Sequence, residues 1–288
     1  MGTPTERLPP PQQDTERGRG PPAPVAAERP SYARPGAGAL PGSDRLERRA
    51  YSEAYESVTF TVTTRARREL TVTLAAQPVF DLARSAPVAR RIRRMVRHQG
   101  GERALLGLGR RTLEPADLHR IDLMTLRAGL DLLRLDQDES GLLPTYWRTI
   151  ASSRGRFALL CTELQHARAR GMLMVEVIGG LEQAPPDAIA EAISHFETAA
   201  QGVVLHIAPD PAAARRLTGV GARCLVIDFA GVEHEHLHDW RDAARLIQAA
   251  RQACGQLLLL NLRPDRGLAA HAAGATHAVF AGMDTLRV

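Results

Sequence analysis

The sequence predicts an α/β protein whose strands close into a TIM-like βα barrel, preceded by a disordered N-terminal tail. Short apolar segments alternate with amphipathic ones from about residue 145 onward, which indicates a parallel sheet with helices on both faces. This unit repeats along most of the chain and is compatible with either a closed barrel or an open doubly wound sheet. No glycine-rich phosphate loop follows the early strands, which weakens the dinucleotide-binding open sheet and favours the barrel.

Residues 1–50 differ in composition from the rest of the chain. They are rich in Pro, Gly, Arg and Glu and have few periodic apolar positions. Such a segment cannot bury enough surface to offset its conformational entropy, so we expect a disordered tail followed by one domain over residues 51–288. The clusters Pro9 to Pro11 and Pro21-Pro22 leave open a polyproline docking site as an alternative to a plain flexible tail.

The first elements are two strands and a helix. Residues 57–63 and 70–79 alternate apolar and polar side chains, many of them β-branched, which is typical of half-buried strands. Residues 115–135 carry apolar side chains at intervals of three and four, which predicts a long amphipathic helix.

The remaining segments are expected to alternate between strand and helix. Short apolar runs predict strands at residues 145–150, 172–178, 202–207, 223–229, 256–261 and 276–280. Helical spacing predicts helices at residues 154–169, 186–199, 211–217, 238–253 and 268–273. In the first of these helices Phe157, Leu160 and Leu164 fall on one face. Ser152 is expected to cap its start, and a phosphate site there is the alternative.

Composition excludes several classes of protein. All 37 basic residues are arginine and the formal net charge is +5, which does not by itself establish nucleic-acid binding. The three cysteines are widely spaced, odd in number and form no CxxC pair, so they suggest no disulfide framework and are expected to be core residues. No signal peptide and no apolar run long enough to cross a bilayer is visible, so we expect a cytoplasmic protein without a membrane span.

Five segments, in their order along the chain, resemble the strand motifs of one known family. They are Gln77-Pro78-Val79-Phe80-Asp81-Leu82, which resembles an opening strand, and Met172-Leu173-Met174-Val175-Glu176-Val177, Leu225-Val226-Ile227-Asp228-Phe229, Gly255-Gln256-Leu257-Leu258-Leu259-Leu260 and Gly274-Ala275-Thr276-His277. Their joint order resembles the EAL domain, a bacterial family that hydrolyses cyclic di-GMP. The resemblance covers roughly residues 70–280 and implies an EAL-type barrel.

The resemblance also implies a site of two divalent cations, held by Glu, Asn and Asp side chains at the strand ends, that activate water against the phosphodiester. Laid over this chain, the family's site falls on Gln77, Arg91, Arg148, Glu176, Asp210, Asp228 and Asn261. Arg91 replaces a metal-binding glutamate, and the paired aspartates fall on Ala208-Pro209 with Asp210 next. The strand lysine falls on Val226.

Only Glu176 and Asp228 remain as carboxylates in register. Two carboxylates flanked by arginines cannot hold two hard dications, which need several oxygen ligands each. We therefore expect no metal or other cofactor and no catalytic residue. In our preferred account an arginine at the barrel mouth pairs with Glu176 or Asp228 and fills the place of the metals.

Two further clusters invite a functional interpretation. The run containing Arg90, Arg91, Arg93 and Arg94 is either a solvated face or an anion-binding patch. The histidines His234, His236 and His238 are two residues apart, so in an extended segment they would lie on one face and could bind a metal. The expected structure is instead a solvated loop.

The sequence thus predicts a catalytically inactive EAL-like domain that serves bacterial signalling as a regulatory or protein-interaction module. The expected partner is another protein. Binding of cyclic di-GMP is an open sub-case, against which the missing family glutamate and lysine argue. One alternative is a metal-dependent cyclic di-GMP phosphodiesterase with shifted ligands. A second alternative is an anion or nucleic-acid binder that uses the arginine run.

Overall fold

The computed structural model of the chain describes residues 57–98, 101–102, 113–133, 140–159, 164, 172–230 and 240–282. The predicted tail, residues 1–50, lies outside the described residues. The three histidines His234, His236 and His238, which were weak metal candidates, also lie outside them.

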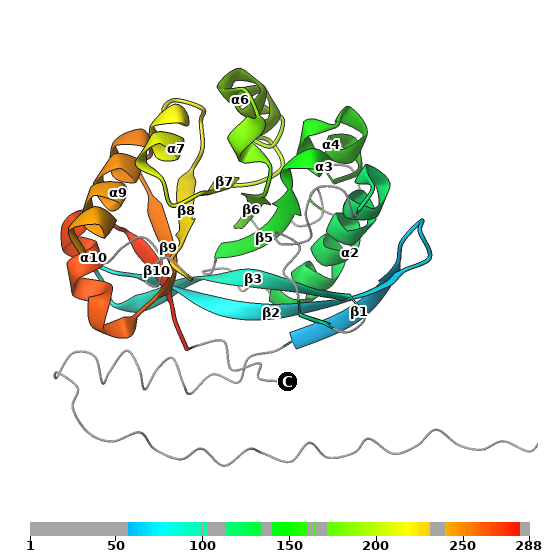
Figure 1. Ribbon diagram of the computed structural model, residues 1–288, viewed down its shortest axis with the longest axis horizontal. Coiled ribbons are helices and arrows are strands. Elements are labelled where there is room, and N and C mark those ends of the chain that lie inside the picture. Colours follow the sequence, from blue (N-terminus) through cyan, green and yellow to red (C-terminus); the bar gives the residue numbers. More distant parts are fainter. Residues whose placement is uncertain are drawn as a thin grey trace, which may run out of the picture. The chain divides into compact units, whose positions relative to one another are not determined.

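Eight strands close into a barrel, as predicted (Figure 1). Around the barrel they are β2 (Glu69–Asp81), β10 (His277–Phe280), β9 (Leu257–Leu262), β8 (Cys224–Asp228), β7 (Gly202–Ile207), β6 (Leu173–Ile178), β5 (Ser140–Tyr146) and β3 (Ala86–His98). Neighbours from β3 through β10 run parallel, whereas β2 runs antiparallel to both β3 and β10. Because β2 returns directly into β3 through a tight turn, these two strands need no crossover helix.

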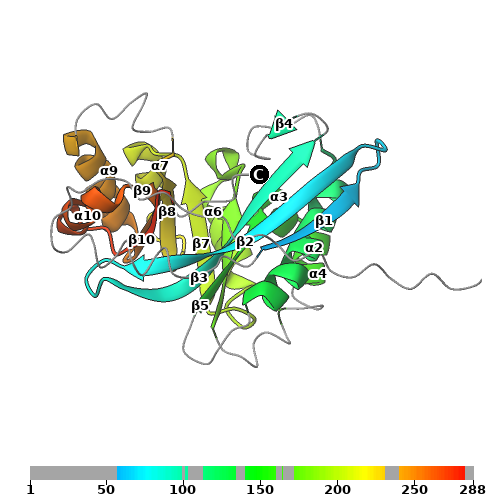
Figure 2. The same ribbon diagram turned by 90° about the horizontal axis from the view of Figure 1, so that it is seen from below.

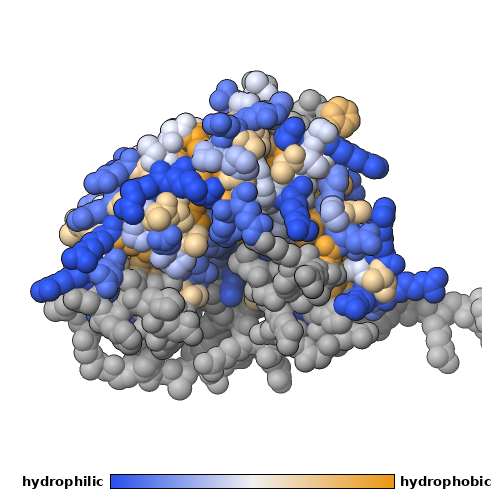
Figure 3. Space-filling model, turned by 45° about the horizontal axis from the view of Figure 1, so that its top comes forward, coloured by the Kyte–Doolittle hydropathy of each residue, from blue (hydrophilic) through white to orange (hydrophobic). Residues whose placement is uncertain are grey.

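Helices follow the parallel strands and cover the outside of the barrel (Figures 1 and 2). They are α2 (Pro115–Leu133), α3 (Trp147–Ala151), α4 (Ser153–Leu159), α6 (Pro186–Ser194), α7 (Pro211–Arg216), α9 (Trp240–Ala253) and α10 (Gly267–Ala273), with short 3-10 turns η2 (Leu181–Gln183) and η3 (Pro264–Arg266). None of the described helices combines the length and the apolar character that crossing a lipid bilayer requires. On the face seen in Figure 3, hydrophilic side chains dominate and apolar ones form small patches.

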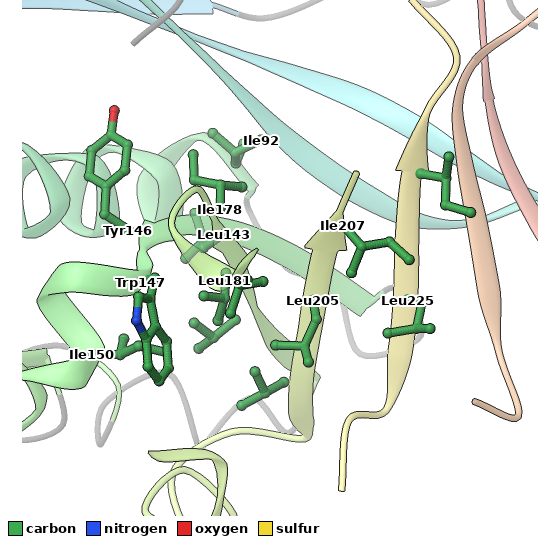
Figure 4. Packing of buried hydrophobic residues seen from close by; sticks show 14 of the residues in the cluster. Ile92, Leu143, Tyr146, Trp147, Ile150, Ile178, Leu181, Leu205, Ile207 and Leu225 are labelled. Carbon is green, nitrogen blue, oxygen red and sulfur yellow. The ribbon is translucent and has the colours of Figure 1, made fainter. Parts of the chain in front are cut away.

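Two apolar cores stabilise the barrel. A small core inside it is built from short or branched side chains, among them Val79, Ala89, Val204 and Cys224. A larger core lies between the strands and the helices, where side chains such as Leu143, Leu205 and Leu225 pack (Figure 4). Alternate residues of a strand point to opposite faces, so the parallel strands contribute apolar side chains to both cores.

Strands β2 and β3 extend beyond the barrel as a hairpin. They pair antiparallel from Leu70 and His98 at one end to Asp81 and Ala86 at the other. Strand β1 (Ser57–Thr63) pairs antiparallel with the outer part of β2, and β4 (Gly101–Glu102) pairs with the end of β3.

The structure corrects three sequence expectations. Strand β3 was not predicted, because five arginines interrupt its few buried apolar residues, of which Ala89 faces the inside of the barrel and Ile92 and Val96 face the helices. The strand predicted at residues 145–150 is wrong: β5 ends at Tyr146 and helix α3 begins at the next residue. Phe157 was predicted to lie on the buried face of its helix, but its side chain is 69% exposed.

A tertiary contact explains why β5 ends early. The segment that follows Thr145 is rich in residues that favour strands, but a carboxylate of helix α2 holds it in a turn. The backbone N–H of Tyr146 donates to Asp122 Oδ2 at 3.0 Å, and the hydroxyl of Thr149 donates to the same oxygen. Local β propensity is therefore overridden by a partner distant in the sequence.

Candidate functional site

A buried ion pair joins two strands inside the barrel. Arg91 of β3 donates from Nε to Glu176 Oε2 at 2.7 Å and from Nη2 to Oε1 at 2.8 Å. Arg91 is 8% exposed and Glu176 is fully buried. Its Nη1 also donates to Gln77 Oε1 of β2 at 3.1 Å. Of the two carboxylates expected to pair with an arginine, Glu176 and Asp228, it is Glu176 that does so, in the two-bond geometry that a guanidinium and a carboxylate favour.

The environment keeps Glu176 ionised. Burial alone would raise the pKa of this carboxyl, but the charge of Arg91 and its hydrogen bonds lower the pKa to about 2, with a smaller contribution from His206. The Nδ1 atom of His206 on β7 lies 3.5 Å from Glu176 Oε1, at the outer limit of a hydrogen bond. The site therefore holds a carboxylate whose two oxygens are both occupied by one guanidinium.

This lowered pKa predicts a dependence of stability on acid. An unfolded Glu176 takes up a proton near its ordinary pKa of 4.5, whereas the folded one does so at about 2. The contribution of Glu176 to the free energy of unfolding should be complete above pH 4.5 and disappear as the pH falls toward 2. Urea unfolding at stepped pH should show this loss in the natural protein and not in Glu176→Gln. Equal slopes for the two would contradict the assignment.

A second polar pair lies on the neighbouring strands. Asn261 of β9 donates from Nδ2 to Asp228 Oδ1 of β8 at 2.6 Å, and the same oxygen accepts the backbone N–H of Ala230 at 2.8 Å. Asn261 has a φ of 55°, in the left-handed region, next to a shift of register between β9 and β10. This irregularity turns the Asn261 amide toward Asp228, since a bulge redirects a side chain.

Two other predicted site residues lie apart from these pairs. Asp210 caps helix α7: its carboxylate accepts the backbone N–H groups of Ala212 at 3.0 Å and Ala213 at 3.3 Å. Arg148 lies on helix α3 with an exposed side chain, and not on a strand end as the predicted strand had implied. Neither side chain contributes a hydrogen bond or an ion pair to the Arg91–Glu176 pair.

Comparison with known proteins identifies the type of barrel. No protein-family model and no curated protein matches the sequence. Among solved structures, the S helix–GGDEF–EAL segment of LapD from Vibrio cholerae matches with a TM-score of 0.50 and 13% identity, over 74% of this chain and 53% of that one. This barrel has the fold of an EAL domain. The predicted EAL-type architecture is thereby confirmed.

Two further EAL structures are similar. One is the YkuI protein of Bacillus subtilis, solved with its substrate cyclic di-GMP and calcium, at TM-score 0.49 and 14% identity over 71% of this chain and 53% of that one. The other is an EAL protein of Listeria monocytogenes, at 0.49 and 12%, covering 84% and 92%. The chain spans about half the length of the Vibrio and Bacillus structures. At such identities the likeness shows the fold alone.

The residues present in this EAL fold do not suit the divalent cations that the family resemblance implies. Both oxygens of Glu176 face Arg91, and the residue beside Glu176 on the neighbouring strand β5 is Pro144, which has no side-chain ligand atom. Within the described ranges no group of three or more His, Cys, Asp or Glu side chains could hold a metal ion. Hard dications need several oxygen ligands each.

The arginine run does not form one patch. Arg91 and Arg93 lie on one face of β3, while Arg90 and Arg94 lie on the other, because alternate residues of a strand point to opposite sides. The interpretation as a solvated face is wrong for Arg91 and Arg94, whose side chains are 10% and 2% exposed. Anion binding by the run stays a prediction.

Arg94 forms a second buried ion pair, outside the barrel. Its Nη1 donates to Asp122 Oδ1 of helix α2 at 2.7 Å, and its guanidinium lies 4.0 Å from the centre of the Tyr146 ring. Burial would lower the pKa of Arg94, but Tyr146 and Asp122 raise it, so the guanidinium stays charged. Burial raises the pKa of Tyr146 despite the opposing effect of Arg94.

The sequence did not single out Asp122 or His206. Both lie in segments whose apolar periodicity is the dominant signal, and their partners are distant in the chain. The expectation for Ser152 is confirmed, because its Oγ accepts the backbone N–H of Gly155 at 2.9 Å at the start of helix α4. The signal that could have indicated Asp122 is an aspartate among the apolar residues of the predicted helix at 115–135, because a buried carboxylate needs a cationic partner such as an arginine of the run at residues 90–97.

Proposed function

We propose that this chain is a catalytically silent EAL-type domain that acts in bacterial signalling as a regulatory or protein-interaction module. The observation that supports this proposal most directly is the two-bond contact between Arg91 and Glu176. It puts a permanent cation against the carboxylate that, by resemblance to the family, would have held a metal.

Charge and burial both disfavour metal binding at Glu176. A divalent cation would meet the repulsion of the Arg91 guanidinium, which does not lose its proton in proteins. Displacing Arg91 would instead leave its charge unpaired in a buried place, which costs several kcal/mol. The other carboxylate in register, Asp228, is already hydrogen-bonded to Asn261 and to the backbone of Ala230.

The link to cyclic di-GMP rests on the fold and on the resemblance of the strand motifs. An EAL barrel without its metal ligands keeps a shape on which another protein can dock, while the hydrolytic device is absent. Binding of cyclic di-GMP without hydrolysis is a sub-case of this proposal, and Gln77 is the family position that favours it.

The proposal predicts no hydrolysis of cyclic di-GMP. The full chain incubated with the dinucleotide and Mg²⁺ or Mn²⁺ should form no linear product above the level of protein-free buffer, as followed by chromatography. The conservative variant Asp228→Asn should give the same result, and so should Asp187→Asn, which alters an exposed residue of helix α6.

A different outcome would establish the alternative enzyme. Metal-dependent turnover that Asp228→Asn abolishes and Asp187→Asn preserves would show a phosphodiesterase with shifted ligands. It would overturn the proposed silence of the site.

Anion or nucleic-acid binding through the arginine run has weaker support. Arg91 and Arg94 are each paired with a buried carboxylate, and the run is divided between two faces of β3. An interface with nucleic acid needs arginines that meet the phosphates from one surface. The described geometry therefore favours a structural role for these two arginines.

A further inference from the structure

Strand β1 has an open edge. It is the terminal strand of the sheet order, and within the described ranges no strand pairs with its outer side (Figure 2). Thr64 N–H donates to Arg68 O across the β1–β2 turn, so by the antiparallel alternation Val62, Phe60 and Val58 direct their backbone groups toward β2. The backbone groups of Thr59 and Thr61 therefore point outward. Arg120 of helix α2 reaches the outward carbonyl of Thr63 at 3.3 Å, which agrees with this alternation.

Apart from the contact of Arg120 with Thr63 at one end, the edge lacks the features by which proteins prevent strand pairing. Exposed edges are usually protected by charged side chains, proline or a bulge. Between Ser57 and Thr63 there is no charged residue and no proline, and the register with β2 is regular. By contrast, β3, which lies next to the other end of the sheet order, contains five arginines.

The sequence of β1 is nearly palindromic. Around Phe60, Thr59 matches Thr61, Val58 matches Val62, and Ser57 is matched by the similar Thr63. A strand with this symmetry is complementary to a second copy of itself in antiparallel orientation, because a twofold axis exchanges each residue with its symmetric counterpart.

We propose that β1 pairs antiparallel with β1 of a second copy of this chain, so that the sheets of the two copies join into one continuous sheet through their β1 strands. The twofold axis passes between Phe60 and the partner's Phe60. Thr59 then faces the partner's Thr61, and since both direct their backbone groups outward, they exchange two hydrogen bonds. Phe60 and its counterpart form the closer, non-hydrogen-bonded pair, in which side chains contact directly.

Burial is consistent with this arrangement. Val58 and Phe60 are only partly buried against the core, whereas Val62 is fully buried. In the dimer Val58 lies opposite the partner's Val62, and the two Phe60 rings cover each other. Apolar surface left at the edge of one chain is thereby removed from water. The inference rests on β1 alone and is independent of the proposed function.

The first test compares two substitutions at one position. Thr61→Pro removes an outward N–H but no hydrogen bond to β2, so the fold should persist, as circular dichroism would verify. Sedimentation should show a dimer for the natural protein, and the dimer Kd of Thr61→Pro should rise roughly 100-fold, since two hydrogen bonds of about 1.4 kcal/mol are lost. Thr61→Ala keeps the N–H and should dimerise like the natural protein.

The second test reads the register. Phe60→Cys should form an intermolecular disulfide on mild oxidation, whereas Val58→Cys should not, because its two copies lie four residues apart along the paired strands. A natural protein that stays monomeric at high concentration would overturn the proposal. So would a dimer that Thr61→Pro leaves intact, or equal cross-linking of the two cysteine variants.

Discussion

Replacing Glu176 by leucine is expected to lower the free energy of unfolding by about 3–5 kcal/mol, because it leaves the buried Arg91 guanidinium without its carboxylate. The amide oxygen of Gln77, 3.1 Å from Nη1, would still accept a hydrogen bond from Arg91, but it carries no charge. An amide cannot replace a charge that accepts two hydrogen bonds. Denaturant unfolding followed by circular dichroism measures the loss.

The control is the paired replacement Arg91→Met with Glu176→Leu. Removing both charges and filling the space with apolar side chains is often neutral for a buried ion pair. We expect the double variant to recover most of the stability lost in Glu176→Leu. A small loss should remain, because Gln77 no longer accepts the hydrogen bond from Arg91. Losses that simply add would show that the two side chains do not interact.

Asp122→Ala is expected to have an effect of similar size, again about 3–5 kcal/mol. The Asp122 carboxylate accepts from three groups that belong to different elements: the Arg94 guanidinium, the Tyr146 backbone N–H and the Thr149 hydroxyl. Without it, Arg94 is a buried unpaired cation, and the junction between β5 and α3 loses the contact that ends the strand.

The matched control for Asp122 is Asp131 on the same helix, whose side chain is exposed. Asp131→Ala should change the free energy of unfolding by no more than about 0.5 kcal/mol, as surface substitutions usually do. A comparable effect of the two substitutions in thermal or denaturant unfolding would mean that helix propensity, and not the buried network, determines the loss.

The apolar pattern was sufficient to predict most of the barrel. Strands β1 and β7 have the predicted bounds, since their alternation or apolar run is uninterrupted from Ser57 to Thr63 and from Gly202 to Ile207. Strand β3 was missed because the partners that make its arginines compatible with burial lie 28 and 85 residues away in the sequence. A single segment contains no information on such partners.

The candidate site was predicted in part. Overlaying the family pattern led us to expect that an arginine at the barrel mouth pairs with Glu176 or Asp228, and in the structure Arg91 pairs with Glu176. It could not place Arg148, because the end of β5 is set by Asp122 and not by the local residues. The sequence alone could not show that Asp210 caps helix α7. An aspartate before Pro211 is compatible with a helix cap and equally with a metal ligand at the end of a strand.

The Arg91–Glu176 pair also restricts which mutational routes are open to this sequence. Arg91→Glu alone would place two carboxylates together in a buried place, where like charges repel and protonation is favoured. Replacing Glu176 alone by a neutral residue would instead leave the Arg91 cation buried without its carboxylate. A path from this chain to a metal-binding barrel would keep Glu176 and replace Arg91 by a carboxylate, so it passes through a buried pair of like charges that destabilises the fold until a cation binds.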